Sequence, residues 1–154
     1  MKLHLLAVGQ KMPSWVQAGY EDYTRRLPSH LAPLLREIPA GDRRGGDTAR
    51  AVAAEGERLL AALPKDCRVV ALDERGEGWT TRELAGRLEE WQAGGGDVAR
   101  LVGGPDGLAP ACLERAELRW SLSRLTLPHA LVRVVVAEQL YRAWTLLQGH
   151  PYHR

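Results

Sequence analysis

The chain has 154 residues, of which 45% are hydrophobic, and a formal net charge of +2 at pH 7. This length is typical of one domain with its own core, so residues 1–154 are expected to form a single domain. The composition argues against a disordered chain, and no apolar run reaches the ~18 residues of a membrane span. The small net charge does not by itself indicate nucleic-acid binding. The two cysteines lack metal-ligand spacing, so a reduced, cytoplasmic protein is expected.

Apolar runs of strand length alternate along the chain with segments of helical periodicity. Asp47 is expected to cap one helix, and Thr80 with Glu83 forms a capping-box pattern at the start of another. In chain order, the expected elements are a strand at 2–8, a helix at 14–26, a strand at 34–38, a helix at 47–63, a strand at 68–72, a helix at 80–93, a strand at 98–102, one or two helical turns within 109–117, a strand at 118–122 and a helix at about 131–148. This alternation predicts an α/β fold with a mainly parallel sheet and helices on both faces. The glycine-rich loop 41–47 is expected to be the most mobile segment.

A glycine-rich turn follows the fourth expected strand. Residues 103–107 read Gly-Gly-Pro-Asp-Gly, and glycines at a strand end let the backbone approach a ligand because no Cβ intervenes. The turn carries no lysine, and the chain has neither a dinucleotide-binding glycine fingerprint after its first strand nor a P-loop motif. Gly103 and Gly104 are therefore candidates for contact with a nucleoside-like ligand. The alternative is an ordinary tight turn.

A second candidate is the apolar, hydroxyl-bearing loop before the last helix. It consists of Leu122, Ser123, Arg124, Leu125, Thr126 and Leu127. Its backbone groups, with Ser123 or Thr126, can bind the edge of a flat heterocycle while the leucines pack on its faces. The alternative is an ordinary connection into the last helix. Since loops that follow parallel strands meet at one edge of a sheet, the two segments predict one small-molecule pocket.

Charged residues near and within the last helix are candidates for substrate binding. His129 is expected at the helix N-terminus, where the helix dipole opposes its protonation. Arg133 lies one turn later on the same face, and together they suggest an anion-binding site, unless His129 is simply a capping or partly buried residue. Arg142 follows Glu138 by four residues, which fits an ordinary helix salt bridge equally well.

The chain ends in Tyr152, His153 and Arg154. A tyrosine ring can stack on a base, an imidazole can exchange protons and a guanidinium can pair with phosphate. From composition alone, a frayed terminus is the alternative. No metal-ligand motif accompanies these residues, so no metal is expected.

Several of these motifs occur together in one known family. The matching segments are residues 2–9, 11–16, 38–41, 55–57, 72–73, 103–108, 122–129, 133–144 and 151–154. In combination they resemble the ribosomal large subunit methyltransferase H family of the SPOUT class, which methylates N3 of a pseudouridine in large-subunit (23S) ribosomal RNA. The resemblance covers nearly the whole chain.

The resemblance implies S-adenosylmethionine as the methyl donor, a C-terminal trefoil knot, and an obligate homodimer acting on ribosomal RNA in the assembled ribosome. General topology rules argue against any knot, so this expectation depends on the resemblance alone. The family pattern assigns Leu72, Gly103 and residues 122–127 to the donor site. It assigns Tyr152, His153 and Arg154 to the RNA site.

The implied reaction needs no metal, because the methyl group of a sulfonium donor is already electrophilic. The acceptor N3 must lose its proton, so a positive field and a base are expected at the site. Arg133, Arg142 or Arg154 can supply the field, and His129 or His153 can accept the proton. The sequence leaves these choices open. The alternative function is a non-catalytic, ribosome-associated RNA-binding α/β module.

Overall fold

The strands form one parallel sheet, which confirms the α/β prediction. The computed structural model describes residues 1–153, with the backbone alone at His153; within them the strands are β1 (Leu3–Val8), β2 (Leu34–Ile38), β3 (Arg68–Gly78), β4 (Val98–Val102) and β5 (Leu118–Ser121). Their order across the sheet is β2-β1-β4-β3-β5, and every neighbouring pair is parallel. The carboxyl ends of the strands therefore lie along the same edge of the sheet.

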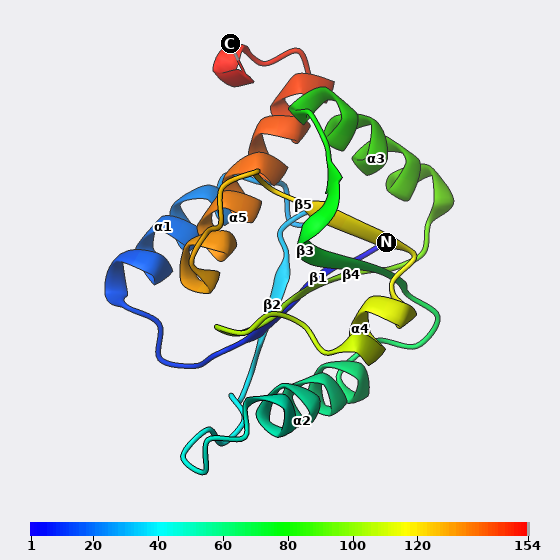
Figure 1. Cartoon of the computed structure of the whole chain (residues 1–154). Coiled ribbons are helices and arrows are strands. Elements are labelled where there is room, and N and C mark those ends of the chain that lie inside the picture. The colour runs from blue at the N-terminus through cyan, green and yellow to red at the C-terminus, as the bar shows by residue number, and fades with distance from the viewer. Residues whose placement is uncertain (154) are drawn as a thin grey trace.

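Helices cover both faces of this sheet, as predicted (Figure 1). They are α1 (Ser14–Thr24), α2 (Thr48–Ala61), α3 (Thr81–Gly94), α4 (Pro110–Arg115), α5 (His129–Leu147) and the short 3-10 helix η1 (Pro151–His153). On one face α5 packs against both α1 and α3, and on the other α2 contacts α4. Both predicted caps are confirmed, since Asp47 accepts a hydrogen bond from the Arg50 amide and Thr80 with Glu83 forms the reciprocal capping box.

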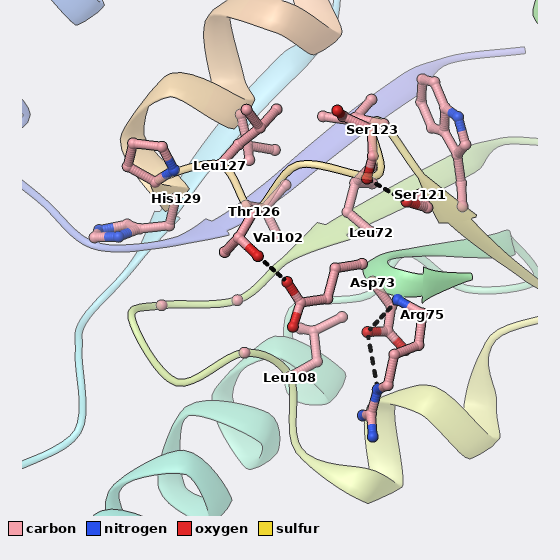
Figure 2. A pocket seen from close by; sticks show the side chains of 18 of the residues that line it. Leu72, Asp73, Arg75, Val102, Leu108, Ser121, Ser123, Thr126, Leu127 and His129 are labelled. Atoms are coloured by element: carbon pink, nitrogen blue, oxygen red, sulfur yellow. Dashed lines mark hydrogen bonds and ion pairs between the residues drawn. The ribbon is translucent and has the colours of Figure 1, made fainter. Parts of the chain in front are cut away.

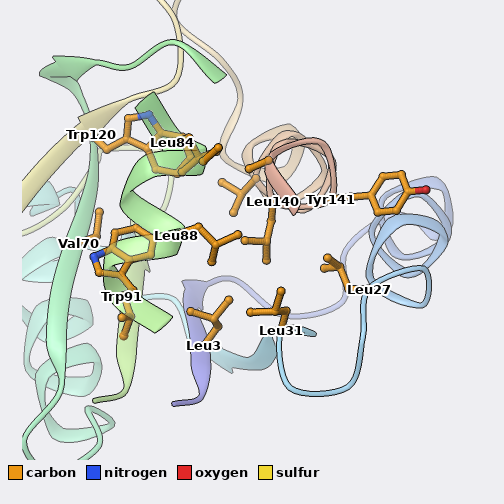
Figure 3. Close-up of a cluster of buried hydrophobic side chains, with 14 residues drawn as sticks. Leu3, Leu27, Leu31, Val70, Leu84, Leu88, Trp91, Trp120, Leu140 and Tyr141 are labelled. Atoms are coloured by element: carbon orange, nitrogen blue, oxygen red, sulfur yellow. The ribbon is translucent and has the colours of Figure 1, made fainter. Parts of the chain in front are cut away.

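The sheet divides the apolar core into two layers. The layer beneath α2 and α4 contains Leu6, Val8, Ile38, Leu59, Val69, Leu101 and Cys112. In the other layer, Leu88 from α3 and Leu140 from α5 pack in one cluster with Leu3 and Val70 from the sheet (Figure 3). The strands β1 and β4 and the first part of β3 are buried on both faces and rich in apolar residues, which is why the sequence located them well.

β3 continues beyond its predicted end at Leu72 to Gly78. Its register with β5 is interrupted between Leu72 and Glu77, and pairing then resumes. The sequence of this extension is polar and lacks the apolar pattern by which strands are recognised, so the prediction stopped too early. The irregular segment places residues 73–75 at the carboxyl edge of the sheet, beside the neighbouring loops.

The helix α5 begins at His129, two residues before its predicted start, and buries Val136, Leu140 and Ala143. Val132 and Trp144 on the same helix remain only half-buried in this chain. Neither α5 nor any other helix within residues 1–153 is long and apolar enough to cross a membrane.

Candidate cofactor site

A cavity of about 620 Å³ lies at the carboxyl ends of β4 and β5, beside the irregular segment of β3 that follows Leu72 (Figure 2). This volume falls within the range of small-molecule sites, roughly 300–1,000 Å³. The glycine turn and the loop before α5 meet in this cavity, so the predicted convergence of the two segments is confirmed. Its walls include these proposed cofactor residues: Leu72, Gly103, Gly104, Leu122, Ser123, Leu125, Thr126 and Leu127.

Gly103 is required by the packing of its own turn. A Cβ at this position would lie 2.5 Å from the carbonyl carbon of Gly107 and 2.8 Å from the backbone nitrogen of Leu108. The turn closes on itself because the Gly107 amide donates to the Gly104 carbonyl at 3.1 Å, with Gly107 at a φ of +80°. From the sequence, ligand approach was the expected reason for this glycine, whereas the structure shows a backbone contact that excludes a side chain whether or not a ligand is bound.

The glycine turn rests on a buried carboxylate in α2. Glu55 is 2% exposed, and a Cβ on Gly104 would lie 3.5 Å from its Oε1. Glu55 accepts hydrogen bonds from the Gly41 amide at 2.9 Å and from Nη1 of Arg43 at 2.7 Å. Arg43 also donates through Nε to Asp106, at 2.9 Å, and thereby links the 41–47 loop to the cavity wall. The loop expected to be mobile is thus anchored at Arg43, and this anchor was not predicted.

The loop before α5 is held by hydrogen bonds of its own. Ser121 Oγ donates to the Ser123 carbonyl and the Leu125 amide donates to Ser123 Oγ, both at 2.9 Å. Leu125 is 74% exposed, so an apolar side chain stands at the rim where a flat ring can pack. Arg124 is exposed and does not line the cavity, so the structure gives its predicted cofactor contact no support.

Residues of the β3 extension form a charged wall that sequence reasoning missed. Asp73 lies 3.7 Å from Nε of Arg75, and Glu74 accepts a hydrogen bond from the Thr126 hydroxyl at 2.9 Å. The Thr126 bond joins two walls of the cavity and is the dashed line from Thr126 in Figure 2. The sequence analysis proposed Leu72 for the donor site and gave no role to the charged side chains directly after it.

His129 lines the cavity as the first residue of α5. Burial, and secondly the nearby Arg133 guanidinium, lower the pKa of His129 below its ordinary value. The imidazole is therefore neutral at pH 7, as the sequence predicted, and burial is the largest cause of the lowered pKa. A neutral imidazole has one nitrogen free to accept a proton.

Arg133 is turned away from the cavity. Its side chain is 2% exposed, pairs through Nη1 with Glu37 at 2.5 Å and donates through Nη2 to the Gly9 carbonyl at 2.7 Å. The guanidinium thus joins the ends of β1 and β2. The predicted anion site formed by His129 and Arg133 is corrected accordingly, because the charge of Arg133 is already paired within the protein.

Arg142, Glu138 and Tyr152 form a cluster at the other end of α5. Glu138 accepts hydrogen bonds from Arg142 Nε and from the Tyr152 hydroxyl, both at 3.0 Å. The Tyr152 ring packs edge-on against Tyr141, with ring centres 4.6 Å apart. The chain end is therefore anchored at Tyr152 rather than frayed. The predicted roles of His153 and Arg154 concern a side chain and a residue that lie outside the described part of the chain.

Burial and the hydrogen bond to Glu138 raise the pKa of Tyr152, so its hydroxyl remains a donor at physiological pH.

Within residues 1–153, no group of three or more His, Cys, Asp or Glu side chains is arranged to hold a metal ion. One feature of the sequence could have predicted that Glu55 is buried. Ala51, Glu55 and Leu59 recur at four-residue spacing and lie on the buried side of α2.

Comparisons with known proteins agree on one family. Residues 1–153 match the family model described as a predicted SPOUT methyltransferase. The ribosomal RNA large subunit methyltransferase H of Thioalkalivibrio sulfidiphilus is 57% identical, covering 100% of this chain and 99% of that protein. Its namesake from Methylococcus capsulatus is 59% identical, with 100% of both chains covered.

The fold has relatives among solved structures at much lower identity. A probable methyltransferase from Bordetella pertussis Tohama I superposes with a TM-score of 0.60 at 18% identity, covering 92% of this chain and 93% of that one. TrmJ from Z. mobilis superposes with a TM-score of 0.54 at 20% identity, over 94% of this chain and 70% of that one. Family model, full-length relatives and fold together show that the chain belongs to the SPOUT methyltransferase family, in the group of the ribosomal RNA large subunit methyltransferase H proteins.

Proposed function

We propose that this methyltransferase uses S-adenosylmethionine to methylate N3 of a pseudouridine in large-subunit (23S) ribosomal RNA, within the assembled ribosome. The observation that carries the proposal is the match of the whole chain, at 57% and 59% identity, to proteins named ribosomal RNA large subunit methyltransferase H. The choice of pseudouridine N3 follows the family resemblance of the sequence motifs. A ribosome-modifying enzyme of this kind acts in the cytoplasm.

The cavity at the sheet edge suits an adenosine-containing donor. Its volume of about 620 Å³ accommodates a ligand of that size. We propose that the backbone at Gly103 and Gly104 and in the 122–127 loop binds the heterocycle, while Leu72, Leu122 and Leu127 pack on its faces. The donor supplies an electrophilic methyl group on a positively charged sulfur. The protein's task is to align the acceptor nitrogen with the methyl–sulfur bond.

The acceptor N3–H must be deprotonated before or during attack. We propose His129 as the proton acceptor, because its ring lines the cavity and its lowered pKa keeps it neutral at pH 7. His153 is the competing candidate. Arg154 is the proposed source of positive charge near the uracil ring. Arg142, which Glu138 holds at the other end of α5 from His129, can contribute to that charge only from the partner chain of the homodimer proposed below.

We propose that the enzyme acts as a homodimer through α5 and forms the C-terminal trefoil knot of its class. Val132, Val135 and Trp144 stay half-buried in one chain, which leaves apolar surface for a two-fold partner. With a net charge of +2, counterion release alone supplies little RNA affinity, so recognition of the ribosome by shape across a dimer surface is expected. Sedimentation at micromolar concentration tests this, and a stable monomer would contradict it.

The decisive experiment transfers labelled methyl groups from S-adenosylmethionine to ribosomes isolated from a strain that lacks the gene, followed by mapping of the modified base. Label on N3 of one pseudouridine in large-subunit RNA is the expected result. Ribosome binding without transfer would instead support the non-catalytic RNA-binding module, and label on another RNA or another base atom would refute the proposed substrate.

A further inference from the structure

The charges around the cavity are unevenly neutralised. Three carboxylates line it, those of Asp73, Glu74 and Asp106. Asp106 is paired with Arg43 at 2.9 Å, and Asp73 lies 3.7 Å from Arg75. Glu74 makes no ion pair within the described part of the chain, and its contact there is the neutral Thr126 hydroxyl. The cavity therefore carries one negative charge that no neighbouring cation balances.

The hydrogen bond from Thr126 fixes where this charge lies. It holds the Glu74 carboxylate between the β3 wall and the 122–127 loop, the two walls proposed to enclose the donor. The other ionisable groups on the cavity wall do not cancel it, because the guanidinium of Arg75 faces Asp73 and the imidazole of His129 is neutral. A cation bound in the cavity would thus experience the field of Glu74.

The donor and the product of a sulfonium methyl transfer differ by one positive charge. When the carbon–sulfur bond breaks, its electron pair stays on sulfur, and the sulfonium becomes a neutral thioether. The adenine, ribose, ammonium and carboxylate groups are common to both molecules, so their interactions with the protein largely cancel when the two affinities are compared. A negative charge in the cavity acts on the remaining difference.

We infer that Glu74 discriminates between charged donor and spent product, favouring S-adenosylmethionine over S-adenosylhomocysteine and so easing product release. The inference rests on the proposed function and deepens it, because it assigns a specificity role to a residue outside the motifs that carry the family resemblance. It requires that the effect be electrostatic, and therefore that it weaken as salt is added.

Glu74→Gln tests this directly, because the amide oxygen can still accept the Thr126 hydrogen bond while the charge is removed. Calorimetric titration of wild type and variant with S-adenosylmethionine and with S-adenosylhomocysteine gives four dissociation constants. Because Glu74 is exposed, the ratio of product to donor dissociation constants is expected to fall by about two- to fivefold in the variant, the range for a solvent-exposed charge pair. Affinity for the product should change little.

Glu89→Gln is the matched control, since Glu89 is an exposed α3 glutamate outside the cavity walls, and its loss changes the net charge equally. It should leave the ratio unchanged. If Glu74→Gln weakens the binding of donor and product equally, or leaves both affinities as they are, the ratio of the two dissociation constants does not change. Either result would overturn the inference without contradicting the proposed donor site. If neither ligand binds the wild-type protein, the proposed function itself fails, and the inference with it.

Discussion

Replacing Arg43 by methionine should destabilise the protein through Glu55 and thereby disturb the cofactor turn. Glu55 is 2% exposed, and Arg43 supplies two of its three hydrogen bonds, at 2.7 and 3.3 Å, together with its counter-charge. Breaking a fully buried ion pair by removing one partner costs about 3–5 kcal/mol. Because the Arg43 side chain is 27% exposed, water can reach the vacated position, so we expect a cost of about 2–3 kcal/mol.

The second half of the test is a double-mutant cycle with Glu55→Gln. Glutamine keeps an oxygen for the Gly41 amide but removes the charge, so it turns its amide group toward Arg43 in the single variant. In the double variant no buried charge is left unpaired. The combined loss should therefore be smaller than the sum of the single losses by about 1–3 kcal/mol, as expected for residues in direct contact.

Urea unfolding followed by circular dichroism measures each free energy of unfolding, with unchanged slope as the check that unfolding remains two-state. Arg44→Met is the matched control, since Arg44 pairs with Asp42 at the surface and should leave the urea midpoint unchanged. Because Gly104 lies over Glu55, Arg43→Met should also weaken S-adenosylmethionine binding. Additive single losses, or an Arg43→Met midpoint equal to that of wild type, would refute the reasoning.

Three further outcomes are expected. Arg100→Met should raise the free energy of unfolding at pH 7 by about 1–3 kcal/mol in urea titrations. Arg100 is buried, two of its nitrogens have no partner among the described residues, and burial lowers its pKa to about 10, so the guanidinium stays charged. A loss of stability would contradict this. If His129 is the base, kcat/KM should not vary near neutral pH and should fall only at a pH below the ordinary pKa of histidine, because the pKa of His129 is lowered. His129→Asn should abolish this pH dependence. An unchanged pH profile would assign the role of base to His153. Deleting residues 152–154 should leave S-adenosylmethionine binding nearly intact and abolish methyl transfer to ribosomes, with a thermal melt to check the lost packing of Tyr152 on Tyr141; transfer near the wild-type rate would show that the tail is dispensable.

Local patterns in the sequence were sufficient for most of the secondary structure. The central strands are rich in apolar residues because both of their faces are buried. The caps at Asp47 and Thr80 depend on contacts with residues three positions further along the chain. Both features can therefore be recognised in short stretches of sequence. The convergence of the glycine turn with the 122–127 loop was also predictable, because parallel strands place their following loops at one edge. The one long misjudged element, the β3 extension, pairs through its backbone and carries no apolar signal.

The tertiary structure decided what the charged residues do. The sequence alone does not show whether Arg133 faces a ligand or, as found, the ends of β1 and β2. The answer depends on which carbonyl and carboxylate groups, remote along the chain, the fold brings close to its guanidinium. The same holds for Arg43 and Glu55, twelve residues apart along the chain, and for Glu74 and Thr126, fifty-two apart. Side-chain charge is visible in a sequence, but its partner and its degree of burial are set by packing between segments that are remote in the chain.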